Sequence, residues 1–268
     1  MIVFPPCKIN LGLYVTGKRA DGFHSISSVF YPVSFCDALE IIQVSGEDGT
    51  FIFSSSGLEI PGNTDSNLVV KAYKLLHALY GLPAVKMHLH KVIPMGAGLG
   101  GGSSDGAWAL RLLNDLFALR IPQEELLNLA ANLGSDCPFF IFDEPCQVSG
   151  RGEILSPISF TLDGYSICLV NPGIHISTAL AFQSVKIEDA PEKWMEQLHL
   201  PPENWTFQNA FEFGIEAILP EINQIKQKLK EEGALYTAMT GTGSTVFGIF
   251  KQAPNIEGKF PRYFSKVI

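Results

Sequence analysis

The amino-acid sequence predicts an α+β protein made of two lobes with a cleft between them. Residues 1–60 alternate apolar and polar runs, separated by turn signals such as Asp21-Gly22 and Asp48-Gly49, which is typical of β-strands. Farther along, segments with the apolar spacing of helices alternate with short apolar runs that are typical of strands. A turn-rich stretch, Ser149-Gly150-Arg151-Gly152-Glu153, interrupts this pattern. We therefore expect two domains, residues 1–155 and residues 156–268.

The individual elements follow from periodicity and from the residues that begin or end a segment. Helical spacing predicts helices over residues 67–80, 107–117, 124–133, 207–219 and 221–232. Gly81 ends the first of these helices, and Pro122 precedes the third. Apolar runs predict strands over residues 85–93, 165–171 and 246–250.

Composition and charge narrow the classes of function. The chain has 268 residues, of which 46% are hydrophobic and 17% charged, as in ordinary globular proteins. A net charge of -8 argues against a general binder of nucleic acid or anionic membranes, so a polyanionic ligand must meet a local positive site. The N-terminal residues show no signal-peptide pattern, and no apolar run approaches the length of a membrane span. The five cysteines form no C-x-x-C pair, which favours a reducing compartment. We expect a cytoplasmic protein with no evident obligate protein partner.

The most informative segment is the glycine-rich run Pro94-Met95-Gly96-Ala97-Gly98-Leu99-Gly100-Gly101-Gly102-Ser103-Ser104. It lies between the strand expected over residues 85–93 and the helix expected over residues 107–117. Glycine leaves backbone N–H groups bare, with no Cβ to keep a large anion away. The start of a helix adds unpaired N–H donors and the positive end of the helix dipole. The run therefore predicts a phosphate cradle.

Three other interpretations of this run must be weighed. The spacing Gly96-x-Gly98-x-x-Gly101 matches the dinucleotide fingerprint, but the acidic residue at the required distance, Asp115, lies inside the expected helix. A Walker A loop fails because no lysine precedes Ser103. A glycine-rich turn that serves only close packing stays open.

The run as a whole resembles the second motif of the GHMP kinase superfamily, whose members phosphorylate small alcohols and acids with ATP. The segment Pro6-Cys7-Lys8-Ile9-Asn10-Leu11 resembles the first motif of that superfamily, and Thr240-Gly241-Thr242-Gly243-Ser244 resembles the third. The motifs occur in the expected order. The resemblance implies a two-lobed GHMP kinase fold, with an N-terminal lobe like domain 2 of ribosomal protein S5 and a ferredoxin-like C-terminal lobe.

Further segments are similar to one branch of the superfamily, the 4-diphosphocytidyl-2-C-methyl-D-erythritol kinases. They are Lys18-Arg19-Ala20-Asp21-Gly22-Phe23-His24, the triple glycine before Ser103-Ser104, and Leu133-Gly134-Ser135-Asp136-Cys137-Pro138-Phe139-Phe140. This resemblance covers essentially the whole chain. It implies an ATP- and Mg²⁺-dependent kinase that phosphorylates the 2-hydroxyl of the cytidine diphospho-alcohol in the non-mevalonate route to isoprenoid precursors. The alternatives are another small-molecule GHMP kinase, of mevalonate or homoserine type, and a non-catalytic metabolite sensor with the same fold.

The resemblance assigns catalysis to Asp136 and Lys8. Asp136 would accept the proton of the acceptor hydroxyl, and Lys8 would stabilise negative charge as the phosphoryl group moves. Local sequence alone favours a helix N-cap or an Asx-turn for Asp136 and a solvated surface position for Lys8. The apolar neighbours of Lys8 make such a surface position less ordinary.

The resemblance assigns substrate binding to Asn10, Phe23, His24 and Phe182. Phe23 and His24 offer cytosine an aromatic face and an imidazole for its polar edge. Similar enzymes carry tyrosine in place of Phe23, and Phe23 has no hydroxyl to form a hydrogen bond. Phe182 corresponds to a second stacking aromatic, with core packing as the alternative because its neighbours are apolar. Asn10 would hold either the acceptor hydroxyl or the Lys8 ammonium.

The resemblance places ATP along the glycine run, with Asn67 and Lys91 at the adenine and ribose end and Gly241 and Gly243 closing the third motif. The remaining nucleotide-binding residues are Pro94, Met95, Gly96, Ala97, Gly98, Leu99, Gly100, Gly101, Gly102, Ser103 and Ser104. Either serine could reach phosphate or Mg²⁺, and the sequence assigns no metal ligand. Asn67 and Lys91 could instead be plain surface residues. The two glycines could form a tight turn before the strand over residues 246–250.

Overall fold

The computed structural model describes residues 1–268, which group into two compact units that interleave along the chain. Unit 1 contains Met1–Cys7, Pro32–Met95 and Gly100–Glu144; unit 2 contains Lys8–Tyr31, Gly96–Leu99 and Pro145–Ile268. This grouping follows spatial contacts and differs from the linear division at residue 155 that the sequence suggested. None of the helices is long and apolar enough to cross a membrane.

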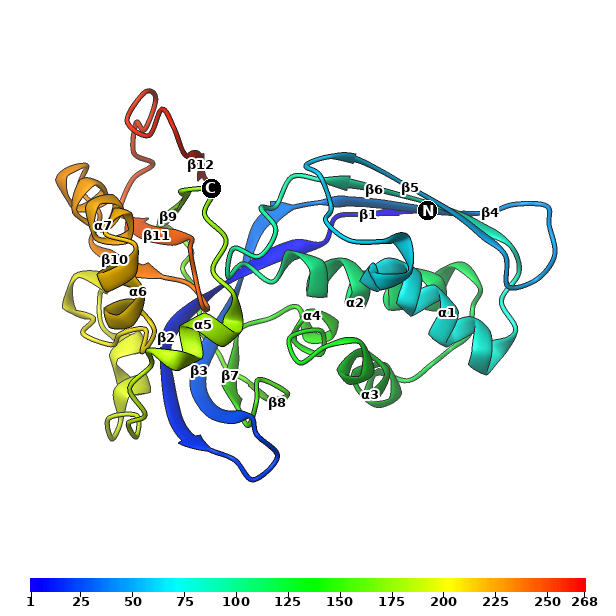
Figure 1. Ribbon diagram of the computed structural model, residues 1–268, viewed down its shortest axis with the longest axis horizontal. Coiled ribbons are helices and arrows are strands. Elements are labelled where there is room, and N and C mark those ends of the chain that lie inside the picture. The colour runs from blue at the N-terminus through cyan, green and yellow to red at the C-terminus, as the bar shows by residue number, and fades with distance from the viewer. The chain divides into compact units, whose positions relative to one another are not determined.

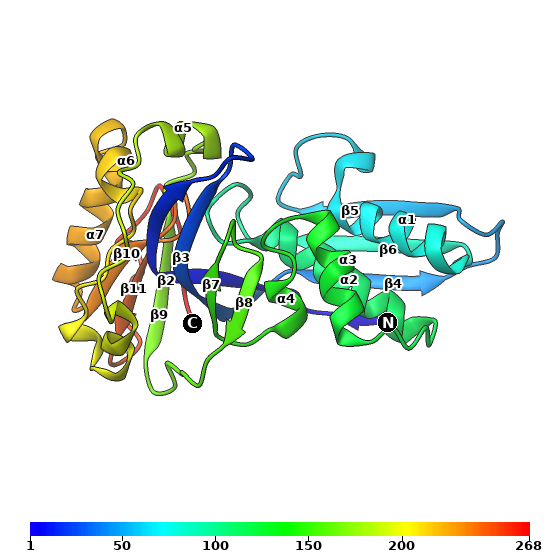
Figure 2. The ribbon, with the colours of Figure 1, turned by 90° about the horizontal axis from the view of Figure 1, so that it is seen from below.

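Unit 1 is a four-stranded sheet with helices on one face (Figures 1 and 2). The strand order is β1 (Ile2–Val3), β4 (Ala38–Gln43), β6 (Val85–Lys91) and β5 (Phe51–Gly57), and only β5 and β6 run parallel. The short helix η1 (Thr64–Ser66) leads into α1 (Leu68–Tyr80), which packs against α2 (Gly101–Leu116). The helices α3 (Gln123–Leu133) and α4 (Phe139–Phe142) also contact α2.

Side-chain alternation along β6 determines which side of this strand is buried. Val85, Met87 and Leu89 are buried, whereas the residues that alternate with them are exposed or half-buried. The next inward position belongs to Lys91, which is only 1% exposed. A charged residue at such a position requires partners, because desolvation of an unpaired ammonium is costly.

Unit 2 contains most of one four-stranded sheet and all of another. The first has the order β2 (Pro6–Lys18), β3 (His24–Cys36), β7 (Cys146–Ser149) and β8 (Ile154–Pro157). The second is antiparallel, with the order β10 (Tyr236–Met239), β11 (Val246–Phe250), β9 (Ser166–Asn171) and β12 (Phe264–Val267). The helices of this unit are α5 (Thr178–Gln183), η2 (Trp194–His199), η3 (Pro202–Asn204), α6 (Glu212–Ile218) and α7 (Glu221–Glu231).

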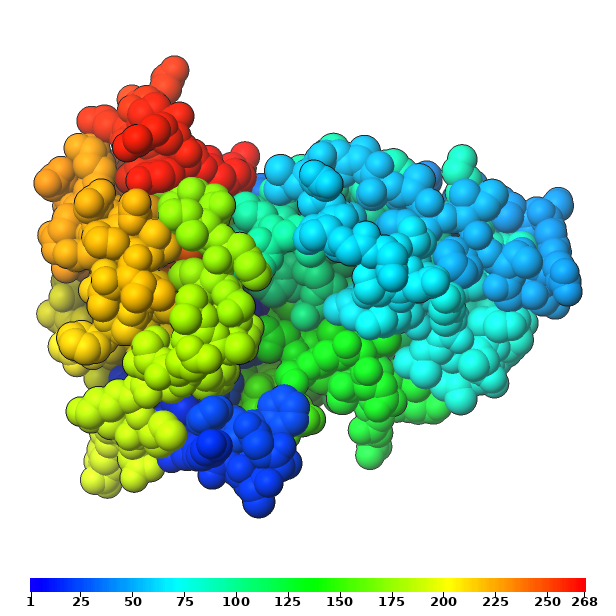
Figure 3. All heavy atoms as spheres, viewed as in Figure 1, coloured from blue at the N-terminus to red at the C-terminus, as the bar shows by residue number.

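The core of unit 2 forms where α7, the second sheet and strand β2 meet. Ile222, Ile225 and Leu229 line one side of α7 and pack with Val246 and other residues of the sheet. Leu13 and Val15 of β2 belong to the same cluster, so this strand is anchored by hydrophobic burial. In Figure 3, α7 (orange) and the C-terminal segment (red) lie at the surface of this unit.

The structure confirms the α+β class and most of the predicted elements, with two corrections. The helix expected over residues 107–117 begins earlier, at Gly101. Close packing explains the early start: a Cβ on Gly101 would come within 2.8 Å of Ile93, and one on Gly106 within 2.8 Å of Leu68. Tertiary contacts therefore outweigh the poor helix propensity of glycine.

The second correction concerns the helix expected over residues 207–219, which begins only at Glu212. The preceding residues instead run beside β2, where Leu13 forms a parallel bridge with Asn209. Phe207 and Phe211 are nevertheless buried. Their apolar spacing therefore reflects side chains buried from a loop and not one face of a helix.

Candidate active site

The glycine-rich run adopts backbone conformations that favour glycine. Gly96, Gly98 and Gly100 all have positive φ angles, of 59°, 77° and 71°. Within unit 2, a Cβ on Gly98 would overlap the carbonyl oxygen of Thr240, and a Cβ on Gly96 would overlap the ring of His175. Close packing thus accounts for part of the glycine content.

Packing does not account for Gly102. Its φ angle is ordinary, and a Cβ built there would meet nothing within 4 Å. The open space lies at the start of α2, whose N-cap residue Gly100 has no side chain to satisfy the N–H groups of the first turn. A bare, uncapped start of a 16-residue helix suits an anion, which supports the phosphate-cradle interpretation.

The two serines after the glycines differ in their surroundings. Ser104 is fully buried, and its hydroxyl has no hydrogen-bond partner. Ser103 forms a hydrogen bond with the thiol of Cys137, while burial raises the pKa of this thiol to about 12. Ser103 therefore joins the first turn of α2 to the segment that carries Asp136.

Asp136 lies half-buried in the turn between α3 and α4. The turn is closed by the hydrogen bond from the Cys137 amide to the Gly134 carbonyl oxygen, at 3.1 Å. The N-cap of α4 is Pro138, with no side-chain cap, so Asp136 is not the N-cap of this helix. The N-cap interpretation of Asp136 is wrong for α4, and the Asx-turn interpretation stays open.

Lys8 is buried in unit 2, at 3% exposure, and not at a solvated surface position. Its ammonium donates to the Asn10 side-chain oxygen at 2.7 Å and to the Gly98 carbonyl oxygen at 3.1 Å, and it lies 4.6 Å from the centre of the Phe30 ring. The strand β2 places Lys8 and Asn10 on the same face, because they are two residues apart. Asn10 thus holds the Lys8 ammonium, one of the two roles expected for it.

Asn10 also joins the first and third motifs. Its Oδ1 accepts hydrogen bonds from Thr240 Oγ1 at 3.1 Å and from the Gly241 amide at 2.9 Å. Its Nδ2 donates to Ser28 Oγ, which in turn donates to the Gly12 carbonyl oxygen. Every polar atom of this buried amide is used, so its position is tightly defined.

The third motif forms a tight turn between β10 and β11 and also contacts the glycine run. The Gly243 amide donates to the Thr240 carbonyl oxygen at 3.0 Å, which closes the turn. Gly241 and Gly243 have φ angles of 57° and 89°, and a Cβ on Gly241 would come within 2.9 Å of Gly98. These glycines therefore form the tight turn and let it approach the glycine run, and their closing against phosphates stays a prediction.

The aromatic residues expected to bind cytosine all lie in unit 2. The rings of His24 and Phe182 stack, with centroids 4.5 Å apart and planes 17° apart, and Phe182 packs edge-on against Phe211. Phe23, at the tip of the β2–β3 hairpin, is 51% exposed, and the guanidinium of Arg151 lies 4.8 Å from its ring centre. An exposed aromatic face beside a cation suits a nucleobase with an attached diphosphate.

Lys91 and Asn67 have structural contacts in unit 1. The Lys91 ammonium pairs with Asp37 and, at 2.6 Å, with Asp105, and all three side chains are almost fully buried. Asn67 caps α1 by accepting a hydrogen bond from the Val69 amide at 2.9 Å. Lys91 is thus not a plain surface residue, and a nucleotide-binding role for Asn67 and Lys91 stays a prediction.

Asp37 and Asp105 were missed by the sequence analysis. Asp37 accepts hydrogen bonds from the amides of Val92 and Ile93, which lead into the glycine run, while Asp105 lies one turn into α2. Asp105 is the only signal the sequence offered, since it is an acidic residue among small residues just before the helix predicted over residues 107–117. Asp37 precedes a strand with no motif around it.

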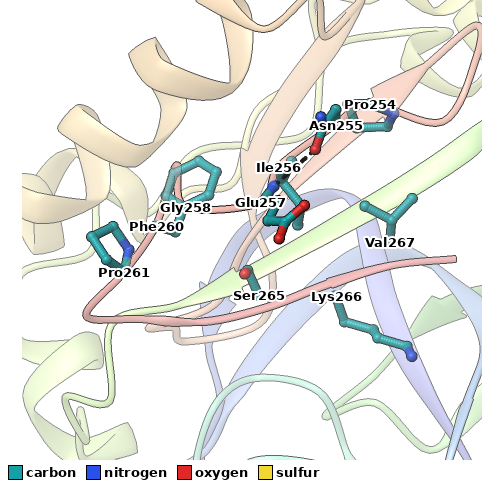
Figure 4. A pocket seen from close by; sticks show the side chains of 10 residues that line it. All are labelled: Pro254, Asn255, Ile256, Glu257, Gly258, Phe260, Pro261, Ser265, Lys266 and Val267. Carbon is teal, nitrogen blue, oxygen red and sulfur yellow. Dashed lines mark hydrogen bonds between the residues drawn. The ribbon is translucent and has the colours of Figure 1, made fainter.

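A surface hollow of about 450 Å³ lies elsewhere in unit 2, beside β12 (Figure 4). None of the predicted site residues lines it. Its lining consists of Pro254, Asn255, Ile256, Glu257, Gly258, Phe260, Pro261, Ser265, Lys266 and Val267. No buried charge or nucleophile is among these residues, so the hollow has no evident chemistry.

Comparison with known proteins shows the family of this chain. Residues 67–144 match the GHMP kinases N terminal domain, and residues 188–266 match the GHMP kinases C terminal domain. The chain is 45% identical to 4-diphosphocytidyl-2-C-methyl-D-erythritol kinase of Bacteroides fragilis over 258 residues, which cover 96% of this chain and 94% of that protein. It belongs to this family of GHMP kinases.

Other relatives agree with this family. The kinase of the same name from Azobacteroides pseudotrichonymphae is 44% identical, over 97% of each chain. The crystal structure of a 4-(cytidine 5'-diphospho)-2C-methyl-D-erythritol kinase has a TM-score of 0.82 and 29% identity, covering 100% of this chain and 98% of that one. The Methanococcus jannaschii mevalonate kinase, at 15% identity and a TM-score of 0.72 over 100% of this chain and 96% of that one, shares the fold.

The Asp37–Lys91–Asp105 cluster predicts a pH-dependent stability. Burial raises the pKa of Asp105 from 3.8 to about 7, opposed by Lys91 and reinforced by Asp37. The folded state therefore keeps a proton that the unfolded chain loses above pH 3.8, so stability falls as pH rises toward 7 and then levels off. The slope is at most about 1.4 kcal/mol per pH unit.

Urea unfolding of the wild type and of Asp105→Asn at several pH values measures this effect. As pH rises through this range, the free energy of unfolding of the wild type should fall relative to that of Asp105→Asn, because asparagine has no proton to lose. Asp65→Asn is the control, because Asp65 is an exposed carboxylate of the same unit. Parallel pH curves for wild type and Asp105→Asn would contradict the prediction.

Proposed function

We propose that this chain transfers the γ-phosphoryl group of ATP to the 2-hydroxyl of 4-diphosphocytidyl-2-C-methyl-D-erythritol, giving the 2-phosphate and ADP. The observation that carries this proposal is 44–45% identity, over nearly the whole chain, to kinases named for this substrate. The reaction belongs to the non-mevalonate route to isoprenoid precursors. The network around Lys8, Asn10 and Thr240 supports it, because it fixes a buried cation beside the glycine run.

Lys8 is proposed to stabilise the transferring phosphoryl group. Its ammonium is held by the Asn10 side chain and the Gly98 carbonyl oxygen, so its charge has a fixed position. A preorganised charge in a buried environment stabilises developing negative charge without reorganising during the reaction. Asn10 acts here by orienting Lys8.

Asp136 is proposed to accept the proton of the 2-hydroxyl as the oxygen attacks phosphorus. Its position in a half-buried turn, followed by the buried α4, limits its solvation. A positioned carboxylate of this kind serves as a general base in phosphoryl transfer to an alcohol. The Ser103–Cys137 contact ties this turn to the start of α2, where the phosphates are proposed to lie.

The remaining ligands are assigned by chemistry. The glycine run and the first turn of α2 would hold the ATP phosphates, and Phe23, His24 and Phe182 would recognise the cytidine. Asn67 and Lys91 are proposed to lie near the adenine end of ATP. Asn67 is held there as the N-cap of α1, and Lys91 is held by its buried ion pairs. Gly241 and Gly243 would let the third motif close on the phosphates.

Mg²⁺ is proposed to accompany ATP. Magnesium takes oxygen ligands and keeps phosphate oxygens and waters among them, so it needs few side chains. The unpartnered hydroxyl of buried Ser104 fits as one such oxygen, with Ser103 as the neighbouring choice. When bound, the ion would neutralise charge on the phosphates. The five cysteines form no C-x-x-C pair, which suits a reducing compartment, so we also propose that the protein works in the cytoplasm.

An assay of ADP release tests the function. ADP should appear with ATP and the cytidine diphospho-alcohol, and not with mevalonate, homoserine or galactose. ADP release with one of those alcohols alone would replace the proposal by another GHMP kinase activity. Nucleotide binding without ADP release from any of them would favour a metabolite sensor.

Replacing either proposed catalytic residue should slow the reaction. Asp136→Ala or Lys8→Ala should lower kcat by about a hundredfold or more, because each removes a group that acts in the transition state. The KM for ATP should change little. Steady-state kinetics measures both quantities, with Asp115→Ala, an exposed carboxylate of α2, as the control. Near-normal turnover in Asp136→Ala would remove it as the base.

Replacing the proposed cytosine-binding residues should weaken substrate binding. Phe23→Ala and His24→Ala should each raise the KM for the cytidine diphospho-alcohol by about tenfold, because stacking on a base is lost. The kcat should change less. Phe213→Ala is a matched control, since Phe213 is an 87% exposed phenylalanine of the same unit. If the KM stays the same in both variants, this hairpin has no part in base recognition.

A further inference from the structure

We propose that Asn209 is a positioning residue for phosphoryl transfer, acting through Thr240 and Gly241 on the Asn10–Lys8 pair. This inference rests on the proposed function, because it assigns Lys8 a role in that reaction. Asn209 lies outside the three motifs and in a segment for which the sequence predicted a helix. All the residues involved belong to unit 2.

The side chain of Asn209 is buried, and each of its polar atoms is used. It is 4% exposed, and its Nδ2 donates to the carbonyl oxygens of Met239 and Gly241, both at 2.8 Å. Its Oδ1 accepts a hydrogen bond from the Phe211 amide at 2.9 Å. Two carbonyl oxygens on one side require the NH₂ group there, so the orientation of the amide is determined.

The backbone of Asn209 is fixed to the strand that carries Lys8 and Asn10. The Leu13 amide donates to the Gln208 carbonyl oxygen at 2.9 Å, and the Ala210 amide donates to the Leu13 carbonyl oxygen at 2.7 Å. These bonds flank Asn209 on both sides. Strand β2 therefore anchors Asn209 directly. The contact is made at Leu13, a buried residue of β2 that follows Asn10 by three residues.

The two carbonyl groups that Asn209 holds bracket the groups that reach Asn10. Between Met239 and Gly241 lie the Thr240 hydroxyl and the Gly241 amide, and both donate to Asn10 Oδ1, at 3.1 Å and 2.9 Å. The same oxygen accepts the hydrogen bond from Lys8 Nζ. Asn209 thus fixes the third-motif loop. The donors of this loop orient the Asn10 side chain, and Asn10 in turn orients Lys8.

The loop needs such an anchor because its own backbone is permissive. β10 ends at Met239, and Gly241 and Gly243 both have positive φ angles, which glycine enters and leaves at little cost. A second contact supports the same segment: Glu212 accepts a hydrogen bond from the Met239 amide at 2.5 Å. That contact precedes the bracketed residues, so it cannot replace the one at Gly241.

The variant Asn209→Asp tests the role with almost no change in shape. The carboxylate still accepts the Phe211 hydrogen bond, but it cannot donate to the two carbonyl oxygens and repels them. We expect kcat to fall by about ten- to hundredfold, since two buried hydrogen bonds are lost. The KM for ATP and for the alcohol should change by less than about threefold, because no ligand contact is removed.

A double-mutant cycle distinguishes positioning from general loosening. In the Asn10→Ala background the connection to Lys8 is already broken, so adding Asn209→Asp should lower kcat by less than about twofold. Tyr236→Phe is the matched control, because it removes one buried hydrogen bond, to the Phe207 carbonyl oxygen, without touching the loop. It should leave kcat near the wild-type value.

Hydrogen exchange provides a readout that needs no substrate. Exchange of the Gly241 amide should be faster by about tenfold or more in Asn209→Asp, because its bond to Asn10 loosens, and unchanged in Tyr236→Phe. If wild type releases no ADP with the cytidine diphospho-alcohol, the proposed function fails while this exchange measurement still decides the positioning of the loop.

The proposal is overturned if folded Asn209→Asp keeps kcat within about twofold of wild type, or if it lowers kcat by the same factor with and without Asn10. Unchanged Gly241 exchange in Asn209→Asp would also overturn it. Should Asn209→Asp fail to fold, Asn209→Ala carries the same comparisons without adding a charge.

Discussion

The buried ammonium of Lys8 is the constraint on which the organisation of unit 2 depends. A charge at 3% exposure is tolerated only when fixed acceptors replace its hydration, and Asn10 and Gly98 supply them. Asn10 can serve Lys8 only because Ser28, Thr240 and Gly241 hold its amide in place. Segments far apart in the sequence are thus brought together by the requirement to satisfy one cation.

A second requirement, close backbone approach, explains where glycine is essential. Gly98 lies against Thr240, and Gly241 lies against Gly98, so side chains at these positions would separate the second and third motifs. At Gly102 no neighbour lies within reach, and the missing Cβ leaves the first turn of α2 open. The same run of glycines therefore packs closely at one end and leaves open at the other the space where a phosphate is proposed to bind.

The sequence predicted the α+β class, the strand and helix that flank the glycine run, and α7, because their hydrophobic periodicity is strong and local. It misjudged the start of α2, since glycine propensity argued against a helix that packing on Ile93 and Leu68 stabilises. It also placed residues 207–211 in a helix, since apolar spacing records burial without recording which hydrogen bonds the backbone makes. Lys91 gave no signal of burial, because its partners Asp37 and Asp105 are distant in sequence.

The sequence by itself determined the family, and with it the residues proposed to act on ATP and the acceptor hydroxyl, because motif chemistry is written in short local segments. Only the tertiary structure decided what holds those residues: Thr240 holding Asn10, Ser103 contacting Cys137, and Asn209 holding the third-motif loop. These are hydrogen bonds between segments separated by up to about 230 residues. Such pairings depend on how the strands and loops assemble, and no local pattern of residues encodes them.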